Sequence, residues 1–105
     1  MSIQMGKWMF EVPYALTETW RLENRAGVYV ILCPVVQNKY SAIDVGESVQ
    51  VKNRLETHDR KDCWKRNCSG TLQVAILYTP HLQPAERSAI EQEIRKQHEP
   101  SCGKR

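Results

Sequence analysis

The stretch that decides the fold covers residues 27–46 and reads Gly-Val-Tyr-Val-Ile-Leu-Cys-Pro-Val-Val-Gln-Asn-Lys-Tyr-Ser-Ala-Ile-Asp-Val-Gly. Its first part, residues 28–32, is dense in β-branched and aromatic residues, which predicts a strand. Residues 33–39 are typical of a turn region, and residues 40–45 predict a second strand that Gly46 ends. Two strands joined by a short connection most simply form an antiparallel hairpin.

A helix is predicted directly after this hairpin. It covers residues 49–59, with Ser48 as a suitable N-cap and with Val51 and Leu55 as an apolar i, i+4 pair. Residues 59–70 are mostly charged and predict no regular element before a turn at their end.

The last elements are a strand and a second helix. Residues 71–78 alternate between polar and apolar side chains and predict a strand that Pro80 ends. Residues 84–98 predict a helix, because Pro84 suits a first helical turn and Ile90 and Ile94 form a narrow apolar stripe.

The order of elements, β-β-α-β-α, predicts an α+β fold in which helices pack on a small, three-stranded, mostly antiparallel sheet. Residues 1–105 form one domain, in which residues 1–25 are an N-terminal extension. Within this extension only residues 7–12 resemble a short strand, which Pro13 would stop.

The composition excludes several classes of protein. With 41% hydrophobic and 26% charged residues, the chain of 105 residues has an ordinary globular balance, which excludes a disordered or fibrous protein. The longest apolar stretch, residues 27–33, is far shorter than the ~20 residues that cross a bilayer. The first residues show no apolar segment of a secretory signal, so we expect a cytoplasmic protein without a membrane partner.

Four cysteines raise the question of a metal site. Without a secretory signal we expect reduced thiols. His58, Cys63, Cys68 and Cys102 could supply four zinc ligands. The gap of four residues between Cys63 and Cys68 is wider than zinc knuckles usually have, so the sequence favours separate thiols, buried or half-buried.

The positive charge is concentrated in one segment. The whole chain carries a formal charge of +3, and residues 52–66 hold six basic against three acidic side chains, a net +3. Basic side chains neutralise phosphates and an indole stacks on bases, so this segment is a candidate nucleic-acid interface. The alternative is a solvated helix face and loop. The candidate interface residues are Lys52, Arg60, Lys61, Trp64, Lys65 and Arg66. For Trp64 the alternative is packing in the core, which is the commoner outcome for a tryptophan.

Five short sequence elements occur in a fixed order and spacing. They are Gly27-Val28-Tyr29, then Asp44-Val45-Gly46, Arg54 eight residues after Gly46, His58 one turn later, and Glu91 nine residues before Pro100. Together they resemble the motifs of the GIY-YIG nuclease family, which includes excision-repair nuclease domains and homing endonucleases. The match covers about residues 26–103.

The resemblance implies a divalent-metal-dependent endonuclease that hydrolyses phosphodiester bonds in DNA. Glu91 would hold one Mg²⁺ or Mn²⁺ ion, hard cations that suit a carboxylate with waters and phosphate oxygens. Arg54 and His58, four residues apart on one predicted helix, would engage the scissile phosphate. Tyr29 and Asp44 would bind and activate the attacking water. Outside the resemblance, Glu91 could simply form an ion pair with Arg87 or Arg95.

Two residues depart from the family pattern. Asp44 stands where the second motif has a tyrosine, and Gly103 stands where the family usually has an asparagine after the late proline. Asp44 could act as a base or second metal ligand, or it could mark a site that has lost activity. The chain is therefore either a nuclease or a catalytically altered nucleic-acid-binding module, and a zinc-stabilised interaction protein is a third hypothesis. Because the chain has little room for a DNA-targeting domain, we expect a homo-oligomer or a separate targeting partner.

Overall fold

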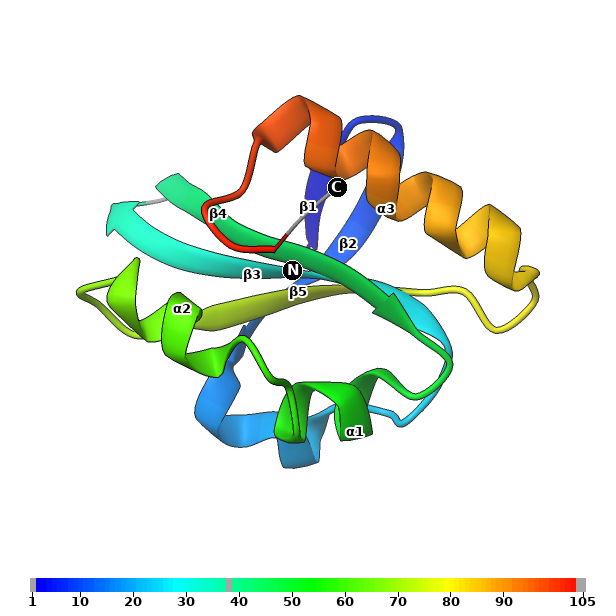
Figure 1. The fold of residues 1–105 in the computed structure, drawn as a ribbon, viewed down its shortest axis with the longest axis horizontal. Helices are drawn as coiled ribbons and strands as arrows, with labels where there is room; N and C mark the ends of the chain where they lie inside the picture. The colour runs from blue at the N-terminus through cyan, green and yellow to red at the C-terminus, as the bar shows by residue number, and fades with distance from the viewer. Residues whose placement is uncertain (1, 38, 104–105) are drawn as a thin grey trace.

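The computed structural model describes residues 2–37 and 39–103, and its fold is α+β (Figure 1). An antiparallel sheet of five strands, in the order β1-β2-β5-β3-β4, carries helices on both faces. The elements in chain order are β1 (Ser2–Met5), β2 (Trp8–Ala15), the 3-10 helix η1 (Leu16–Arg21), β3 (Gly27–Val36), β4 (Lys39–Ser48), α1 (Val51–Glu56), α2 (Lys61–Arg66), β5 (Gln73–Tyr78) and α3 (Pro84–His98).

The predicted β3–β4 hairpin is confirmed, and it is longer than expected. Both strands extend into residues 33–39, so this segment is not the turn region we predicted; Asn38 lies outside the described residues. β4 also continues past Gly46, because Gly27 and Val28 of β3 still pair with Ser48 and Glu47. Pairing with β3 therefore continues the strand beyond the glycine that was expected to end it.

The sheet is larger than the three strands we predicted. β5 lies between β3 and β2, and β1 pairs with the outer side of β2, so the N-terminal residues form two strands of the same sheet. Pro13 does not end β2, which runs to Ala15. The pairing of β2 with β5 shifts register between Glu11 and Tyr14, the kind of irregularity at which a strand accommodates proline.

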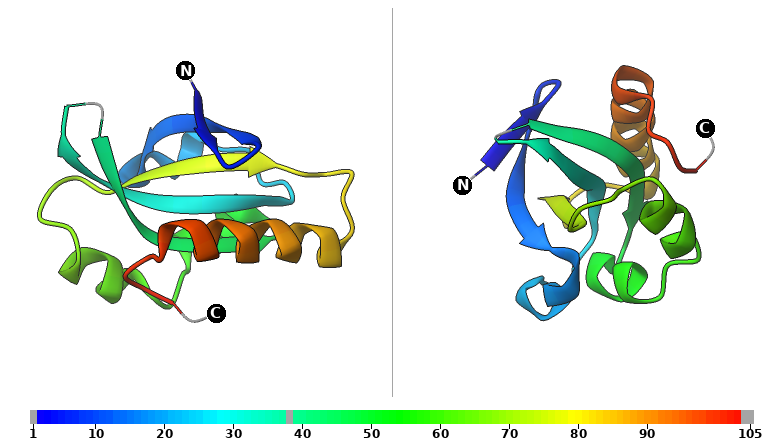
Figure 2. Two further views of the ribbon diagram at one scale, coloured as in Figure 1. Left: turned by 90° about the horizontal axis from the view of Figure 1, so that it is seen from above. Right: turned by 90° about the vertical axis from the view of Figure 1, so that its left-hand side faces the viewer.

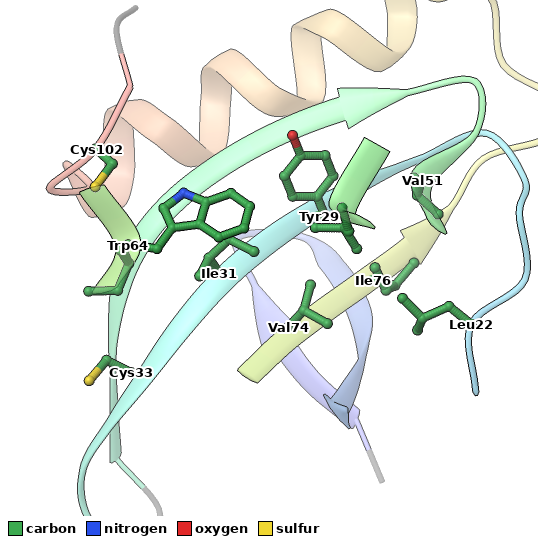
Figure 3. Packing of buried hydrophobic residues seen from close by; sticks show 11 residues of the cluster. Leu22, Tyr29, Ile31, Cys33, Val51, Trp64, Val74, Ile76 and Cys102 are labelled. Carbon is green, nitrogen blue, oxygen red and sulfur yellow. The ribbon is translucent and has the colours of Figure 1, made fainter. Parts of the chain in front are cut away.

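The sheet is buried on both faces, and β3 contributes to both cores (Figure 2). Its residues alternate: Tyr29, Ile31 and Cys33 face one core, whereas Val28, Val30 and Leu32 face the other. Figure 3 shows the first core, where Val51 and Trp64 from the α1–α2 segment cover the sheet. α3 covers the opposite core with Ile90 and Ile94, as the predicted apolar stripe indicated.

The helices follow the prediction in part. α3 begins at Pro84 and ends at His98, as predicted. α1 is shorter than the predicted helix over 49–59, and its N-cap is Gln50; the Ser48 hydroxyl instead accepts a hydrogen bond from the Gln50 N–H at 3.0 Å. α2 lies in the charged segment for which no element was predicted, because only Trp64 among its residues is fully buried and its apolar pattern is too short to recognise.

The cysteines form two disulfides, Cys33–Cys68 and Cys63–Cys102, so the expectation of four separate thiols is wrong. The zinc-site alternative fails with it, because no thiol of this set remains to bind a metal. Among residues 2–37 and 39–103, no cluster of three or more metal-ligating side chains occurs. The pairing joins residues more than 30 positions apart, which cysteine spacing alone does not reveal.

In the part of the chain that the structure describes, no helix has the length and apolar character to cross a membrane.

Candidate active site

The candidate site lies at the edge strand β4, where Tyr29 and Gly46 face each other. They are register partners in the β3–β4 ladder, and the Tyr29 hydroxyl points toward β4 (Figure 3). A Cβ atom at position 46 would lie 2.2 Å from the Tyr29 Oη atom and 2.3 Å from its Cζ atom. The tyrosine ring therefore occupies the space of a side chain at position 46, and only glycine fits there.

His58 fixes the Tyr29 hydroxyl from the other side. The His58 Nε2 atom lies 2.7 Å from the Tyr29 Oη atom, and its Nδ1 atom accepts a hydrogen bond from the Arg60 N–H at 3.1 Å. Burial, reinforced by the charges of Arg54 and Arg60, lowers the pKa of His58 to about 4. The imidazole is therefore neutral at physiological pH with its hydrogen on Nε2, and it donates that hydrogen to Tyr29.

This arrangement leaves the hydroxyl hydrogen of Tyr29 for a further acceptor. Burial raises the pKa of Tyr29 to about 12, and the guanidinium group of Arg54 opposes this rise. Tyr29 is therefore a neutral phenol that accepts from His58 and can donate to an anionic oxygen.

Arg54 and His58 both reach the site, although not from one helix face as we predicted. α1 ends at Glu56, so His58 lies in the loop after the helix. The Arg54 Nη2 atom lies 3.2 Å from the Asp59 carboxylate, and its side chain is 39% exposed. An exposed arginine that pairs with a surface carboxylate can exchange it for a phosphate.

Asp44 is fully buried, and both of its carboxylate oxygens are occupied by donors. Its Oδ2 atom accepts from Arg60 Nε and from Trp64 Nε1, both at 2.7 Å. Its Oδ1 atom accepts from Val45 N–H at 2.8 Å, Arg95 Nη2 at 2.9 Å and Arg60 Nη2 at 3.2 Å. A buried carboxylate that accepts five hydrogen bonds has no free lone pair for a further ligand and anchors the side chains that bind it.

Gly103, the second departure from the family pattern, packs directly on Asp44. Its φ is +84°, and a Cβ atom there would lie 2.8 Å from the Asp44 Oδ1 atom and 2.9 Å from the Arg95 Nη2 atom. A larger residue at position 103 would therefore collide with the Asp44–Arg95 pair. The two departures are physically coupled, because the buried Asp44–Arg95 ion pair occupies the space that a side chain at position 103 would need.

Glu91 lies on α3 with its side chain 16% exposed. Burial raises its pKa, as does the neighbouring charge of Glu47, whereas the charges of Arg95 and Arg60 lower it. Of the two predicted ion-pair partners, Arg95 approaches to 3.8 Å, and Arg87 instead pairs with Glu47 at 2.5 Å. Within the described residues, neither carboxylate oxygen of Glu91 accepts a hydrogen bond.

The carboxylates of Glu91 and Glu47 are ligands of the kind that a hard divalent cation prefers. Mg²⁺ is commonly held by one or two carboxylates and completes its shell with waters and phosphate oxygens, so a larger ligand cluster is not required. Glu91 offers a half-buried carboxylate without hydrogen-bond donors among the described residues, and the Glu47 carboxylate is near enough to raise its pKa. A cation would relieve this repulsion between the two carboxylates.

The six candidate interface residues separate into three groups. Trp64 is fully buried, and its indole donates to Asp44, so it does not stack on a base as we predicted. Arg60 binds Asp44 but its side chain stays 31% exposed, and the Lys61 ammonium group donates to the Glu56 carbonyl at 2.8 Å. The partly exposed Lys52 and the exposed Lys65 and Arg66 remain accessible for nucleic acid.

Arg95 is a residue of this site that the sequence did not reveal. It is 2% exposed and donates to Asp44, to the Val45 carbonyl and, at 3.0 Å, to the Cys102 carbonyl. The sequence did contain a pattern that could have indicated its burial. Arg87, Glu91 and Arg95 are spaced four residues apart beside the Ile90–Ile94 stripe, and this spacing places them next to the packed face of α3.

Comparison with known proteins gives no match to a protein-family model, a curated protein or a solved structure.

Proposed function

We propose that the protein is a divalent-metal-dependent endonuclease that hydrolyses phosphodiester bonds in DNA. The observation that carries the proposal is the hydrogen bond between Tyr29 and His58 beside Gly46, with the exposed Arg54 guanidinium next to it. These groups come from residues 29, 46, 54 and 58, which are positions of the short motifs that resemble the GIY-YIG family.

Each group has a chemical task in such a site. Arg54 and Arg60 supply positive charge for the phosphate oxygens, whose charge increases in the transition state. Tyr29, kept neutral by burial, donates its hydroxyl hydrogen to a phosphate oxygen or to the attacking water. His58 orients that hydroxyl and, because it is neutral, does not compete with it for the anion.

Glu91, assisted by Glu47, would hold the Mg²⁺ or Mn²⁺ ion. When bound, the ion would lower the pKa of its water and stabilise charge on the phosphate. The raised pKa of Glu91 means that its carboxylate binds a proton more readily, so metal affinity should fall as the pH decreases.

A supercoiled-plasmid nicking assay with Mg²⁺, Mn²⁺ or EDTA tests the proposal. We expect metal-dependent nicking that is lost in Glu91→Ala and falls by at least tenfold in Arg54→Gln. Glu93→Ala is the matched control, because Glu93 is an exposed carboxylate on the same helix whose hydrogen-bond partner among the described residues is Gln97. Retained nicking in purified Glu91→Ala would contradict this mechanism.

The second candidate function is a nucleic-acid-binding module without turnover. The engagement of Asp44 favours it, because position 44 offers neither the tyrosine of the family nor a free carboxylate to activate water. This function predicts salt-dependent DNA binding with no nicking in any metal. The absence of both binding and nicking would contradict both functions and favour a protein-interaction role.

A further inference from the structure

We propose that Asp44 is a positioning residue that holds Arg60 as a receptor for a phosphodiester oxygen beside Tyr29 and Arg54. The inference rests on the proposed nucleic-acid function and assigns position 44 a role that differs from a base or metal ligand. The phosphate would then lie between two arginine side chains, one on α1 and one directly before α2.

The contact between Asp44 and Arg60 fixes the guanidinium plane. The Nε and Nη2 atoms of Arg60 both bind the carboxylate, at 2.7 Å and 3.2 Å. In this two-point geometry the Nη1 group lies on the far side of the guanidinium, away from Asp44. In the described part of the chain, Nη1 has no hydrogen-bond partner, and the Arg60 side chain is 31% exposed. Asp44 thus sets the orientation of the Arg60 guanidinium, and the Nη1 group keeps its N–H donors for a ligand.

The support under Asp44 is rigid. Trp64 and Arg95 bind the same carboxylate, and both are almost completely buried. Arg95 also donates to the Cys102 carbonyl, and the Cys63–Cys102 disulfide ties that segment to α2. A buried carboxylate with three side-chain donors and a backbone donor has little freedom to release Arg60.

Arg60 is also connected to the other site residues. Its backbone N–H donates to His58, which in turn binds Tyr29. Its positive charge opposes the pKa rise of both Tyr29 and Glu91, so the guanidinium is close enough to act on both groups. A phosphate bound to Arg60 would therefore lie beside the hydrogen-bonded pair of His58 and Tyr29.

The test uses inorganic phosphate without metal, followed by two-dimensional ¹H–¹⁵N NMR. The Arg60 Nε–H and Trp64 Nε1–H signals report directly on the two donors to Asp44 Oδ2, and a Trp64→Phe spectrum assigns the indole signal. We expect both signals to shift saturably with phosphate. We also expect at least tenfold weaker phosphate binding in Arg60→Gln, and weaker binding in Arg60→Lys, which keeps the charge but loses the fork.

Arg21→Gln is the matched control, because this exposed arginine packs over Tyr14 of β2, three strands away from β4. Unchanged phosphate binding in folded Arg60→Gln would overturn the proposal. If both Arg60 variants failed to fold, the wild-type titration would decide, because Arg60 and Trp64 signals that do not respond to phosphate also overturn it.

The nicking assay separates this inference from the proposed function. Wild-type nicking at an unchanged rate in Arg60→Gln would leave the nuclease standing and remove the role of Arg60. Saturable phosphate binding at Arg60 without nicking in any metal would leave the receptor standing and remove the nuclease.

Discussion

Tyr29 and Gly46 face each other across the antiparallel β3–β4 pair, and the tyrosine ring fills the volume that a side chain at position 46 would need. The pair joins two of the five short elements from which the family resemblance was inferred. It also places the hydroxyl group within 2.7 Å of His58, at the edge strand of the sheet.

Gly46→Ala should therefore destabilise the protein and displace Tyr29. An added Cβ atom would overlap the phenol ring, which is buried in the core and would have to shift. We expect a loss of about 1–3 kcal/mol in the free energy of unfolding, measured by urea denaturation. Gly70→Ala is the control, because its Cβ would meet only the Pro34 carbonyl at 3.9 Å. Equal stability of the two variants would contradict the close contact.

Gly103→Ala should weaken the Asp44–Arg95 pair. The added Cβ atom would press on both partners, and the φ of +84° is unfavourable for alanine. We expect a loss of about 1–3 kcal/mol. Gly6→Ala separates the two causes, because Gly6 has a φ of +61° but its Cβ would meet the flexible end of Gln97. If both variants lose the same stability, the contact with Asp44 contributes nothing.

Stability should increase with pH between about 4 and 6.5 because of His58. Its pKa is lowered to about 4 in the folded protein and lies near 6.5 when unfolded. In this window the unfolded chain binds the extra proton, so the free energy of unfolding gains at most about 1.4 kcal/mol per pH unit and the gain is lost as the pH falls. His58→Gln should flatten this part of the pH profile relative to the wild type. An identical slope in both proteins would show that His58 does not titrate in this way.

Peptide mapping under non-reducing conditions should recover the pairs Cys33–Cys68 and Cys63–Cys102. Because each bond closes a loop of more than 30 residues, its removal should cost up to roughly 4 kcal/mol in the chain-entropy picture. The double variant Cys63→Ala/Cys102→Ala should also release the C-terminal segment from α2. Four free thiols in the native protein would contradict the pairing. The cytoplasmic location expected from the sequence stays a prediction, and two disulfides are more typical of proteins in an oxidising compartment.

Local patterns predicted the parts of the fold that depend on neighbouring residues. The bounds of α3 and the burial of Ile90 and Ile94 follow from helical periodicity and from a proline in the first turn. The β3–β4 hairpin follows from two β-rich runs close together in the chain. The resemblance to the nuclease motifs implied that Arg54 and His58 act at one site, but the helix that was expected to carry both ends before His58.

Partners far apart in the sequence were decided only by the tertiary structure. The position of β5 between β2 and β3, the disulfide pairing and the full set of donors around Asp44 all join distant segments. From the sequence, Asp44 is a carboxylate in place of a tyrosine and Gly103 is a missing asparagine. Folding brings both residues into contact with Arg95. The buried Asp44 carboxylate needs its hydrogen-bond donors, and the Asp44–Arg95 pair leaves no room for a side chain at position 103. The sequence by itself thus determined which residue types the site contains, and three-dimensional packing determined that Asp44 serves as an anchor.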